Sequence, residues 1–154
     1  MTSGETLRER VRAIAATHEG RRGPLLPILH DLQEEFGYLD AEAITVVADV
    51  LNLSRAEVYG VVSFYADFTE VPRGARTVRV CRAEACRAVG SEELAEHATR
   101  RLGVAFGQTA PDRSVTLEQV FCLGNCALGP SVQVDGRLHG RVDAARFDSL
   151  VAGS

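Results

Sequence analysis

The chain has 154 residues, of which 45% are hydrophobic, and this is enough to form one compact domain or two very small ones. Its formal net charge of -4 gives no broad basic field, so we do not expect it to bind nucleic acid or an anionic membrane surface. No apolar run approaches the roughly 18 residues that span a bilayer. The start MTSGETLRERVR is polar, unlike a signal peptide, so we expect a cytoplasmic protein without membrane insertion.

The first half of the sequence has apolar residues at helical spacing. Thr6 and Glu9 are placed to cap a helix that runs to about Thr17, and the segment GRRGP at 20–24 then breaks the chain. A second helix follows and ends at Gly37. Its predicted apolar stripe consists of Leu25, Leu26, Ile28, Leu29, Leu32 and Phe36.

Two further helices are predicted before residue 72. Asp40 can cap the third helix, and Ser54 with Glu57 forms a capping box for the fourth. We interpret residues 1–72 as an N-terminal helical bundle. The predicted fourth helix and the residues after it carry an aromatic cluster. We assign this cluster to the bundle core, and an interface for a partner subunit is the alternative. The cluster consists of Tyr59, Phe64, Tyr65 and Phe68.

After Pro72-Arg73-Gly74 the apolar residues alternate or cluster briefly, which is typical of strands. Residues 77–80 predict a strand that runs into Cys81, and residues 115–121 predict another that runs into Cys122. Ser91 begins a helix between them, which ends at Gly103. The two pairs of cysteines therefore occupy matching places after two strands.

The end of the sequence predicts a hairpin and a last helix. Asp135-Gly136 lies between short alternating segments, which indicates a tight turn, and Asp143 can cap the helix. Residues 73–154 thus read as strand, helix, strand, hairpin and helix. A small sheet with helical cover is the expected packing, so the fold class is α+β or α/β.

Four cysteines in two pairs carry the chemistry of the sequence. The spacing is Cys81-x4-Cys86, then 35 residues, then Cys122-x3-Cys126. Stable disulfides are rare in a reducing compartment, so these thiols suggest metal ligands or redox groups. A 2Fe-2S cluster needs two terminal ligands on each iron and suits two separate loops, whereas zinc sites often use tighter pairs. Spacing favours the cluster but leaves open a zinc-stabilised interaction module. A thioredoxin-type dithiol enzyme is disfavoured because the chain has no CxxC.

At these residues the sequence resembles a known family. The stretches CRAEACRAVG and FCLGNCALGPSVQVDGRLHGRVD are similar to the thioredoxin-like 2Fe-2S subunit of respiratory complex I, bidirectional hydrogenases and soluble NAD-dependent formate dehydrogenases. LLPILHDLQEEFGYL and VYGVVSFYADF resemble the N-terminal half of that family. The Ala-Glu-Ala filling after Cys81 and the loop CLGNCALGP most resemble the gamma subunit of molybdenum formate dehydrogenases. Arg87 departs from that branch, where we expect Gln.

The resemblance implies a thioredoxin-like 2Fe-2S ferredoxin domain behind the helical bundle. It implies that Cys81 and Cys86 bind one iron and that Cys122 and Cys126 bind the other. The chain would have no catalytic site of its own and would pass single electrons, through a cluster that is either a relay or a side store. Its expected partners are a beta subunit with FMN and the NAD site, and an alpha subunit with the molybdenum cofactor; further iron-sulfur clusters would also lie in partners. The equivalent subunit of complex I or of an NAD-reducing hydrogenase is the alternative.

Residues beside the cysteines have possible electrostatic roles. Cations and N–H donors near a cluster favour its more negative reduced state. Arg82 and Arg87 flank the first pair, but we favour their interpretation as solvated loop residues, because exposed charges usually have small effects. Glu84 acts in the opposite direction. Gly124 and Gly129 could let backbone N–H groups approach the sulfurs or could simply shape turns.

Other candidate groups are weaker. The histidines are not close to the cysteines in sequence, so we expect ordinary surface or core histidines rather than ligands. They are His18, His30, His97 and His139. The GRRG segment at 20–23 lacks the Lys-Ser/Thr of a phosphate loop, and we interpret it as a helix connector, with a docking patch as the alternative.

Overall fold

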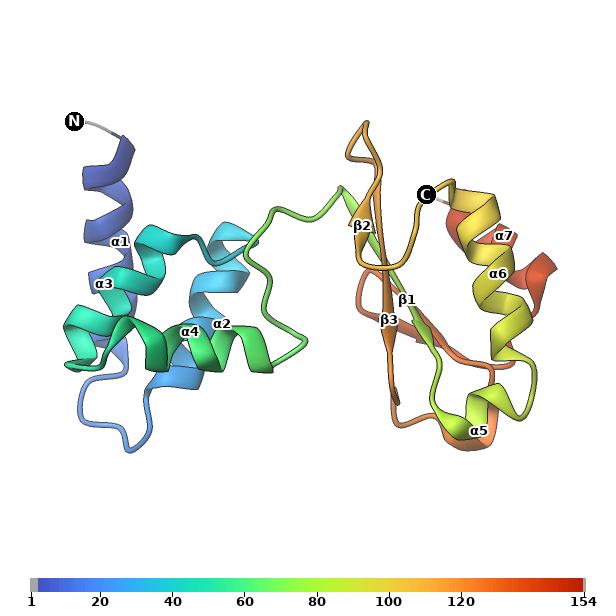
Figure 1. The fold of residues 1–154 in the computed structure, drawn as a ribbon, viewed down its shortest axis with the longest axis horizontal. Coiled ribbons are helices and arrows are strands. Elements are labelled where there is room, and N and C mark those ends of the chain that lie inside the picture. The colour runs from blue at the N-terminus through green and yellow to red at the C-terminus, as the bar shows by residue number, and fades with distance from the viewer. Residues whose placement is uncertain (1–2, 154) are drawn as a thin grey trace. The chain divides into compact units, whose positions relative to one another are not determined.

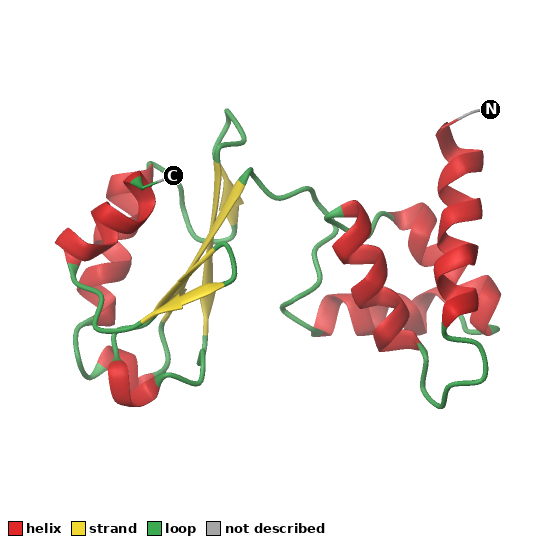
Figure 2. Ribbon diagram, turned by 180° about the vertical axis from the view of Figure 1, so that it is seen from behind, coloured by secondary structure: helices red, strands yellow, loops and turns green. Residues whose placement is uncertain are grey.

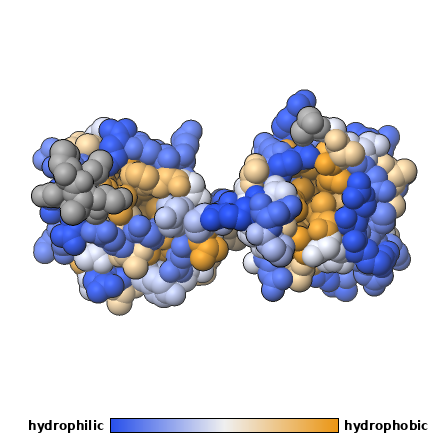
Figure 3. Space-filling view, turned by 90° about the horizontal axis from the view of Figure 1, so that it is seen from above, coloured by the Kyte–Doolittle hydropathy of each residue, from blue (hydrophilic) through white to orange (hydrophobic). Residues whose placement is uncertain are grey.

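The computed structural model describes residues 3–153, and the chain divides into two compact units, residues 1–72 and 73–154 (Figure 1). Each unit has its own cluster of buried hydrophobic residues. Among the described residues, all strands lie in the second unit (Figure 2). Hydrophilic residues cover most of the visible surface of both units (Figure 3). No helix within residues 3–153 is long and apolar enough to cross a membrane.

The first unit is a helical bundle, as the apolar spacing predicts. The predicted stripe of the second helix faces the core, where Ile28, Leu29 and Leu32 are buried. Gly37 ends that helix with a φ of 80°, a left-handed conformation that glycine adopts without a steric cost. The helices of the bundle are α1 (Ser3–Thr17), α2 (Leu25–Phe36), α3 (Ala41–Leu51) and α4 (Arg55–Phe64).

Two predicted helix caps are confirmed in the first unit. The Asp40 carboxylate accepts a hydrogen bond from the Ala43 N–H at 2.7 Å. Ser54 accepts from the Glu57 N–H, and the Glu57 carboxylate accepts from the Ser54 N–H, which completes a capping box. These bonds satisfy N–H groups that have no partner inside the helix.

The first helix begins earlier than its sequence predicts. It starts at Ser3, so Thr6 lies inside the helix and is not its N-cap. Once a turn exists, adding a residue to a helix costs little, so a capping pattern does not exclude further turns before it.

The assignment of the aromatic cluster to the bundle core is wrong for three of its four residues. Phe68 is buried, whereas Tyr59, Phe64 and Tyr65 are exposed, Phe64 to 80%. Val58 and Val62 occupy the buried face of α4. A helix turns about 100° per residue, so positions 59 and 64 lie away from the face that Val58 and Val62 share.

The second unit is a five-stranded mixed sheet with helices on one face. The regular elements are β1 (Arg76–Cys81), α5 (Glu84–Arg87), α6 (Ser91–Leu102), β2 (Gln108–Thr109), β3 (Val115–Val120), η1 (Cys126–Leu128), β4 (Val132–Val134), β5 (Arg137–His139) and α7 (Ala144–Ala152). The strand order is β2-β3-β1-β4-β5, in which β1 and β3 are parallel and the other neighbours are antiparallel. Helices α6 and α7 lie side by side against one face of the sheet (Figure 1).

The predicted hairpin turn and the predicted cap of the last helix are present in this unit. Asp135 and Gly136 have φ values of 48° and 80°, as a tight hairpin of type I′ requires, and they join β4 to β5. The Asp143 carboxylate accepts from the Arg146 N–H at 2.8 Å and caps α7. The short elements α5, β2 and η1 were not predicted, because two to four residues show no measurable periodicity.

Candidate metal centre

The sheet brings the two cysteine pairs to one edge. Cys81 is the last residue of β1 and lies opposite Val120, the last residue of the parallel strand β3. Parallel strands have their carboxyl ends at the same edge, so the loops that follow Cys81 and Val120 leave the sheet together. Cys86 then lies on α5 and Cys126 opens η1, two short elements in contact with each other.

The first pair is buried. Cys81 is 1% exposed and Cys86 is 2% exposed. Burial raises the pKa of the Cys86 thiol, and the neighbouring Cys81 raises it further. Polar groups of Ser131 partly offset this rise in the pKa of Cys86.

The second pair is exposed and its sulfurs are close together. The Sγ atoms of Cys122 and Cys126 are 3.5 Å apart, and the Gly124 N–H donates to the Cys122 sulfur at 3.3 Å. That donor is the main reason that the pKa of Cys122 is lowered. The Cys122 backbone has a φ of 129°, a sparsely populated conformation that persists only where the surrounding structure imposes it, often at functional sites.

Thiols of both pairs affect the pKa of Cys126. Cys122 is the main cause that raises the pKa of Cys126, and the charge of Cys81 in the other loop raises it further. Within residues 3–153, no three or more His, Cys, Asp or Glu side chains lie close enough together to hold a metal ion. Two thiol pairs from separate loops fit a centre that contains two metal atoms with two terminal ligands each.

The loop after Cys126 packs directly on the buried pair. A Cβ atom at Gly129 would lie 3.3 Å from the Cys86 sulfur and 3.0 Å from Cγ2 of Val89. Gly129 therefore allows close packing, but its own N–H donates to the Cys126 carbonyl rather than to a sulfur. The predicted donation to a sulfur is found at Gly124 only.

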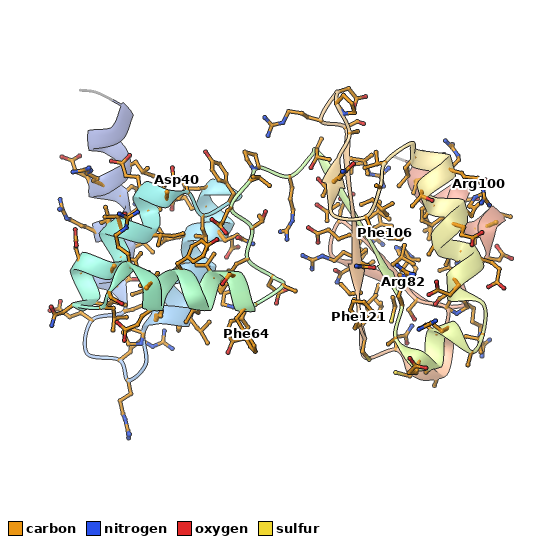
Figure 4. All side chains as sticks on the ribbon, in the orientation of Figure 1. Asp40, Phe64, Arg82, Arg100, Phe106 and Phe121 are labelled. Carbon is orange, nitrogen blue, oxygen red and sulfur yellow. The ribbon has the colours of Figure 1, made fainter. Side chains whose placement is uncertain are left out.

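The arginines beside the first pair are engaged in ion pairs. The Arg82 guanidinium donates to both carboxylate oxygens of Glu92, at 2.8 and 3.2 Å, and to the side chain of Gln119. It also lies over the ring of Phe106, 5.4 Å from its centre (Figure 4). Arg87 is half exposed and pairs with Glu92 at 3.4 Å. Arg82 is thus held by the protein and is not a solvated loop residue.

Three of the four histidines have partners away from the cysteine loops. His18 bonds to Asp31 at 2.6 Å, and His97 bonds to Asp148 at 2.8 Å. His30 packs on the ring of Phe68. The segment at 20–23 connects α1 to α2, as predicted.

The sequence did not predict two residues that connect the cysteine loops, Ser131 and Asn125. The Asn125 side-chain amide donates to the Ser131 hydroxyl at 3.1 Å, and the Cys81 N–H donates to the Ser131 carbonyl at 3.0 Å. The only sequence signal was position, because Asn125 lies between Cys122 and Cys126 and Ser131 precedes the first hairpin strand.

The chain has a small mixed sheet, helices on one face of it, and two cysteine loops at one sheet edge. These features define the class of the protein as an iron–sulfur protein of thioredoxin-like fold. Residues 11–154 match the family described as thioredoxin-like 2Fe-2S ferredoxin. The chain belongs to this family, which implies that it carries a 2Fe-2S cluster. The predicted fold, a helical region followed by a thioredoxin-like ferredoxin domain, is thereby confirmed.

The relatives of the chain are subunits of larger oxidoreductases. It is 38% identical to a subunit of the NADH-quinone oxidoreductase of Rhizobium meliloti, over 95% of this chain and 87% of that protein. It is 36% identical to the NADP-reducing hydrogenase subunit HndA of Solidesulfovibrio fructosivorans, over 86% of this chain and 77% of that protein. Among solved structures, the air-oxidised NAD+-reducing NiFe hydrogenase matches 84% of this chain with a TM-score of 0.72 and 26% identity, although this chain spans only 22% of that one.

Proposed function

We propose that this chain is an electron-transfer subunit whose 2Fe-2S cluster is held by four cysteines. Cys81 and Cys86 would bind one iron, and Cys122 and Cys126 the other. The observation that supports this proposal most strongly is that the loops after β1 and β3 bring two interacting thiol pairs to one sheet edge. When bound, the cluster accepts and donates one electron at a time. The chain positions the four sulfurs, buries one pair and leaves the other accessible, and has no catalytic site of its own.

The exposed pair gives the proposed cluster a surface for electron exchange. Phe121, which is labelled in Figure 4 and lies next to Cys122, is 69% exposed. Leu128, two residues after Cys126, is also exposed. Large apolar side chains around an exposed redox group suit a protein partner. The expected partner is the subunit that holds FMN and the NAD site, because the relatives are named as NADH- or NADP-linked enzymes. A cytoplasmic location stays a prediction.

The next proposal concerns which oxidoreductase complex contains this subunit. We infer a soluble NAD-dependent formate dehydrogenase, in which a molybdenum-containing alpha subunit oxidises formate, from the Ala83-Glu84-Ala85 filling and the CLGNCALGP loop. The second candidate is complex I or an NAD(P)-reducing hydrogenase, which the relatives at 38% and 36% identity favour. A zinc-stabilised interaction module is the rival from another class.

Co-expression distinguishes these candidates. The chain would be produced with flavin and molybdenum subunits from the same genome, and the assembly isolated by size-exclusion chromatography. A stable complex that reduces NAD with formate supports the formate branch. A chain that stays apart from those subunits and instead couples NAD to hydrogen or to a quinone reductase belongs to the other branch. Zinc without iron in the chain itself would contradict electron transfer altogether.

A further inference from the structure

Cys122 and Cys126 are two surface thiols whose sulfurs lie close together. Both residues are exposed, and their Sγ atoms are 3.5 Å apart. The S–S bond of a disulfide is about 2.05 Å long, so the two sulfurs would have to approach by about 1.5 Å to form one. Rotation about the Cα–Cβ bonds of two surface cysteines supplies a movement of this size. The pair is therefore placed to form a disulfide by side-chain movement.

The other pair of thiols is closed to solvent. Cys81 is 1% exposed and Cys86 is 2% exposed. The second cysteine loop covers Cys86 so closely that a Cβ atom at Gly129 would lie 3.3 Å from its sulfur. A thiolate exchanges with a disulfide only where the two sulfurs can meet. An oxidant in solution therefore reaches the exposed pair and not the buried one.

The number of residues between the cysteines does not distinguish the two pairs. Cys122 and Cys126 have three residues between them, and Cys81 and Cys86 have four. Because the entropy cost of closing a loop changes slowly with its length, both pairs should close at similar rates in an unfolded chain. A preference for one pair in the folded chain therefore comes from exposure.

We propose that Cys122 and Cys126 form a redox switch in the chain before it receives a cluster: a small-molecule disulfide oxidises them to an intramolecular disulfide, while the buried pair stays as thiols. In the first step, one thiolate of the exposed pair attacks the small disulfide, whose S–S bond breaks as a mixed disulfide forms and one small thiol leaves. In the second step, the other cysteine attacks the protein sulfur of the mixed disulfide, and the second small thiol leaves. The pair loses two electrons and two protons, and the small disulfide gains them.

The disulfide controls when the chain can be loaded. This consequence rests on the proposed ligation by the four cysteines, in which Cys122 and Cys126 are both terminal ligands of one iron. A disulfide between them removes both ligands at once, so the oxidised chain does not accept a cluster. A dithiol that reduces the disulfide restores the two thiols and, with them, loading. The switch acts before loading, because in the loaded chain both sulfurs are iron ligands.

Mass spectrometry of the full chain tests which pair is oxidised. The iron-free, reduced chain would be incubated with oxidised glutathione, stopped with acid at successive times, unfolded and alkylated with iodoacetamide. We expect the disulfide between Cys122 and Cys126 to form several-fold faster than any bond that includes Cys81 or Cys86. Disulfide formation within the buried pair first, or a mixed disulfide with glutathione that persists in the wild type, would overturn the inference.

Two comparisons show that the fold selects the pair. Cys126→Ser should stop at the mixed disulfide on Cys122, because the second attacking thiol is missing. The same incubation in denaturant should oxidise both pairs at similar rates. A preference for the exposed pair that is equally strong in the unfolded chain would overturn the argument from burial.

Cluster transfer tests the effect on loading. The reduced and the oxidised wild-type chain would each be mixed with a scaffold protein that carries a 2Fe-2S cluster, without free thiol or sulfide, and iron in the re-isolated chain would be measured. We expect several-fold less iron in the oxidised chain, and full recovery after treatment with dithiothreitol. An oxidised chain that loads as well as the reduced one would overturn the switch and leave the proposed function intact. A reduced chain that takes up no iron would instead contradict the proposed function.

Discussion

Replacing Gly129 with Ala tests how tightly the second loop packs on the buried cysteine. The backbone at Gly129 has φ and ψ of -66° and 158°, which alanine adopts without strain, so any effect comes from crowding. The new methyl group would lie 3.0 Å from Cγ2 of Val89, against an optimum of about 3.5–4.0 Å. It would also lie 3.3 Å from the Cys86 sulfur.

The expected cost follows from these contacts. Overpacking costs about 1–3 kcal/mol, and the lower entropy of the unfolded alanine chain offsets about 0.4–1 kcal/mol. With the middle of each range, the free energy of unfolding of the second unit should fall by about 1.3 kcal/mol, which lowers its Tm by about 5–10 °C in a unit of this size. Circular dichroism of the iron-free, reduced chain would measure the Tm, and iron analysis would follow cluster retention.

Two controls sharpen the test. Adding Val89→Ala to Gly129→Ala removes the crowded methyl and should recover most of the lost stability. Gly60 lies inside α4 with nothing within 4 Å of an added Cβ, so Gly60→Ala should stabilise the first unit by about 0.5–1 kcal/mol and leave iron content unchanged. If Gly129→Ala keeps both its Tm and its iron, the close contact with Cys86 is refuted.

Three further predictions concern the thiols and the neighbouring ion pair. Each single Cys→Ser variant should shift or abolish the cluster signal in electron paramagnetic resonance, and an unchanged spectrum would remove that residue from the site. Arg82→Gln should lower the reduction potential because it removes a positive charge and leaves Glu92 with one of its two arginine partners, Arg87. Adding Glu92→Gln removes the negative charge as well and should restore the potential. A double variant no closer to wild type than Arg82→Gln would contradict this reasoning. In the iron-free chain, iodoacetamide should modify Cys122 first and Cys86 last. Because the pKa of Cys122 is lowered, its thiolate is present at lower pH, and the rate of its alkylation should rise at a lower pH than for an ordinary thiol. Mass spectrometry of peptides would measure the order of modification, and alkylation of Cys86 before Cys122 would contradict the prediction.

The sequence predicts most regular elements because local chemistry determines them. Asp40, Ser54 and Asp143 cap helices through bonds to residues three positions away, and the Asp135-Gly136 turn depends on two residues alone. Such short-range interactions leave a readable pattern. The start of α1 was missed because a cap pattern marks a possible boundary rather than a required one.

The sequence predicts the site only in part, because many of its contacts join residues that are far apart in the sequence. The spacing of the cysteines and their positions after two strands predict where the thiols meet. The bridge from Ser131 to Asn125, and the ion pair of Arg82 with Glu92, depend on which loops pack together in three dimensions. The exposure of Phe64 likewise depends on which face of α4 meets the core. No spacing rule contains that information.

Metal analysis with visible absorption and electron paramagnetic resonance of the wild-type chain, purified without oxygen, tests the central claim most directly. We predict a reddish-brown protein with two irons and two acid-labile sulfides per chain, as a 2Fe-2S cluster requires, and a resonance signal that appears on reduction by one electron. A colourless protein that contains zinc and no iron would contradict the claim.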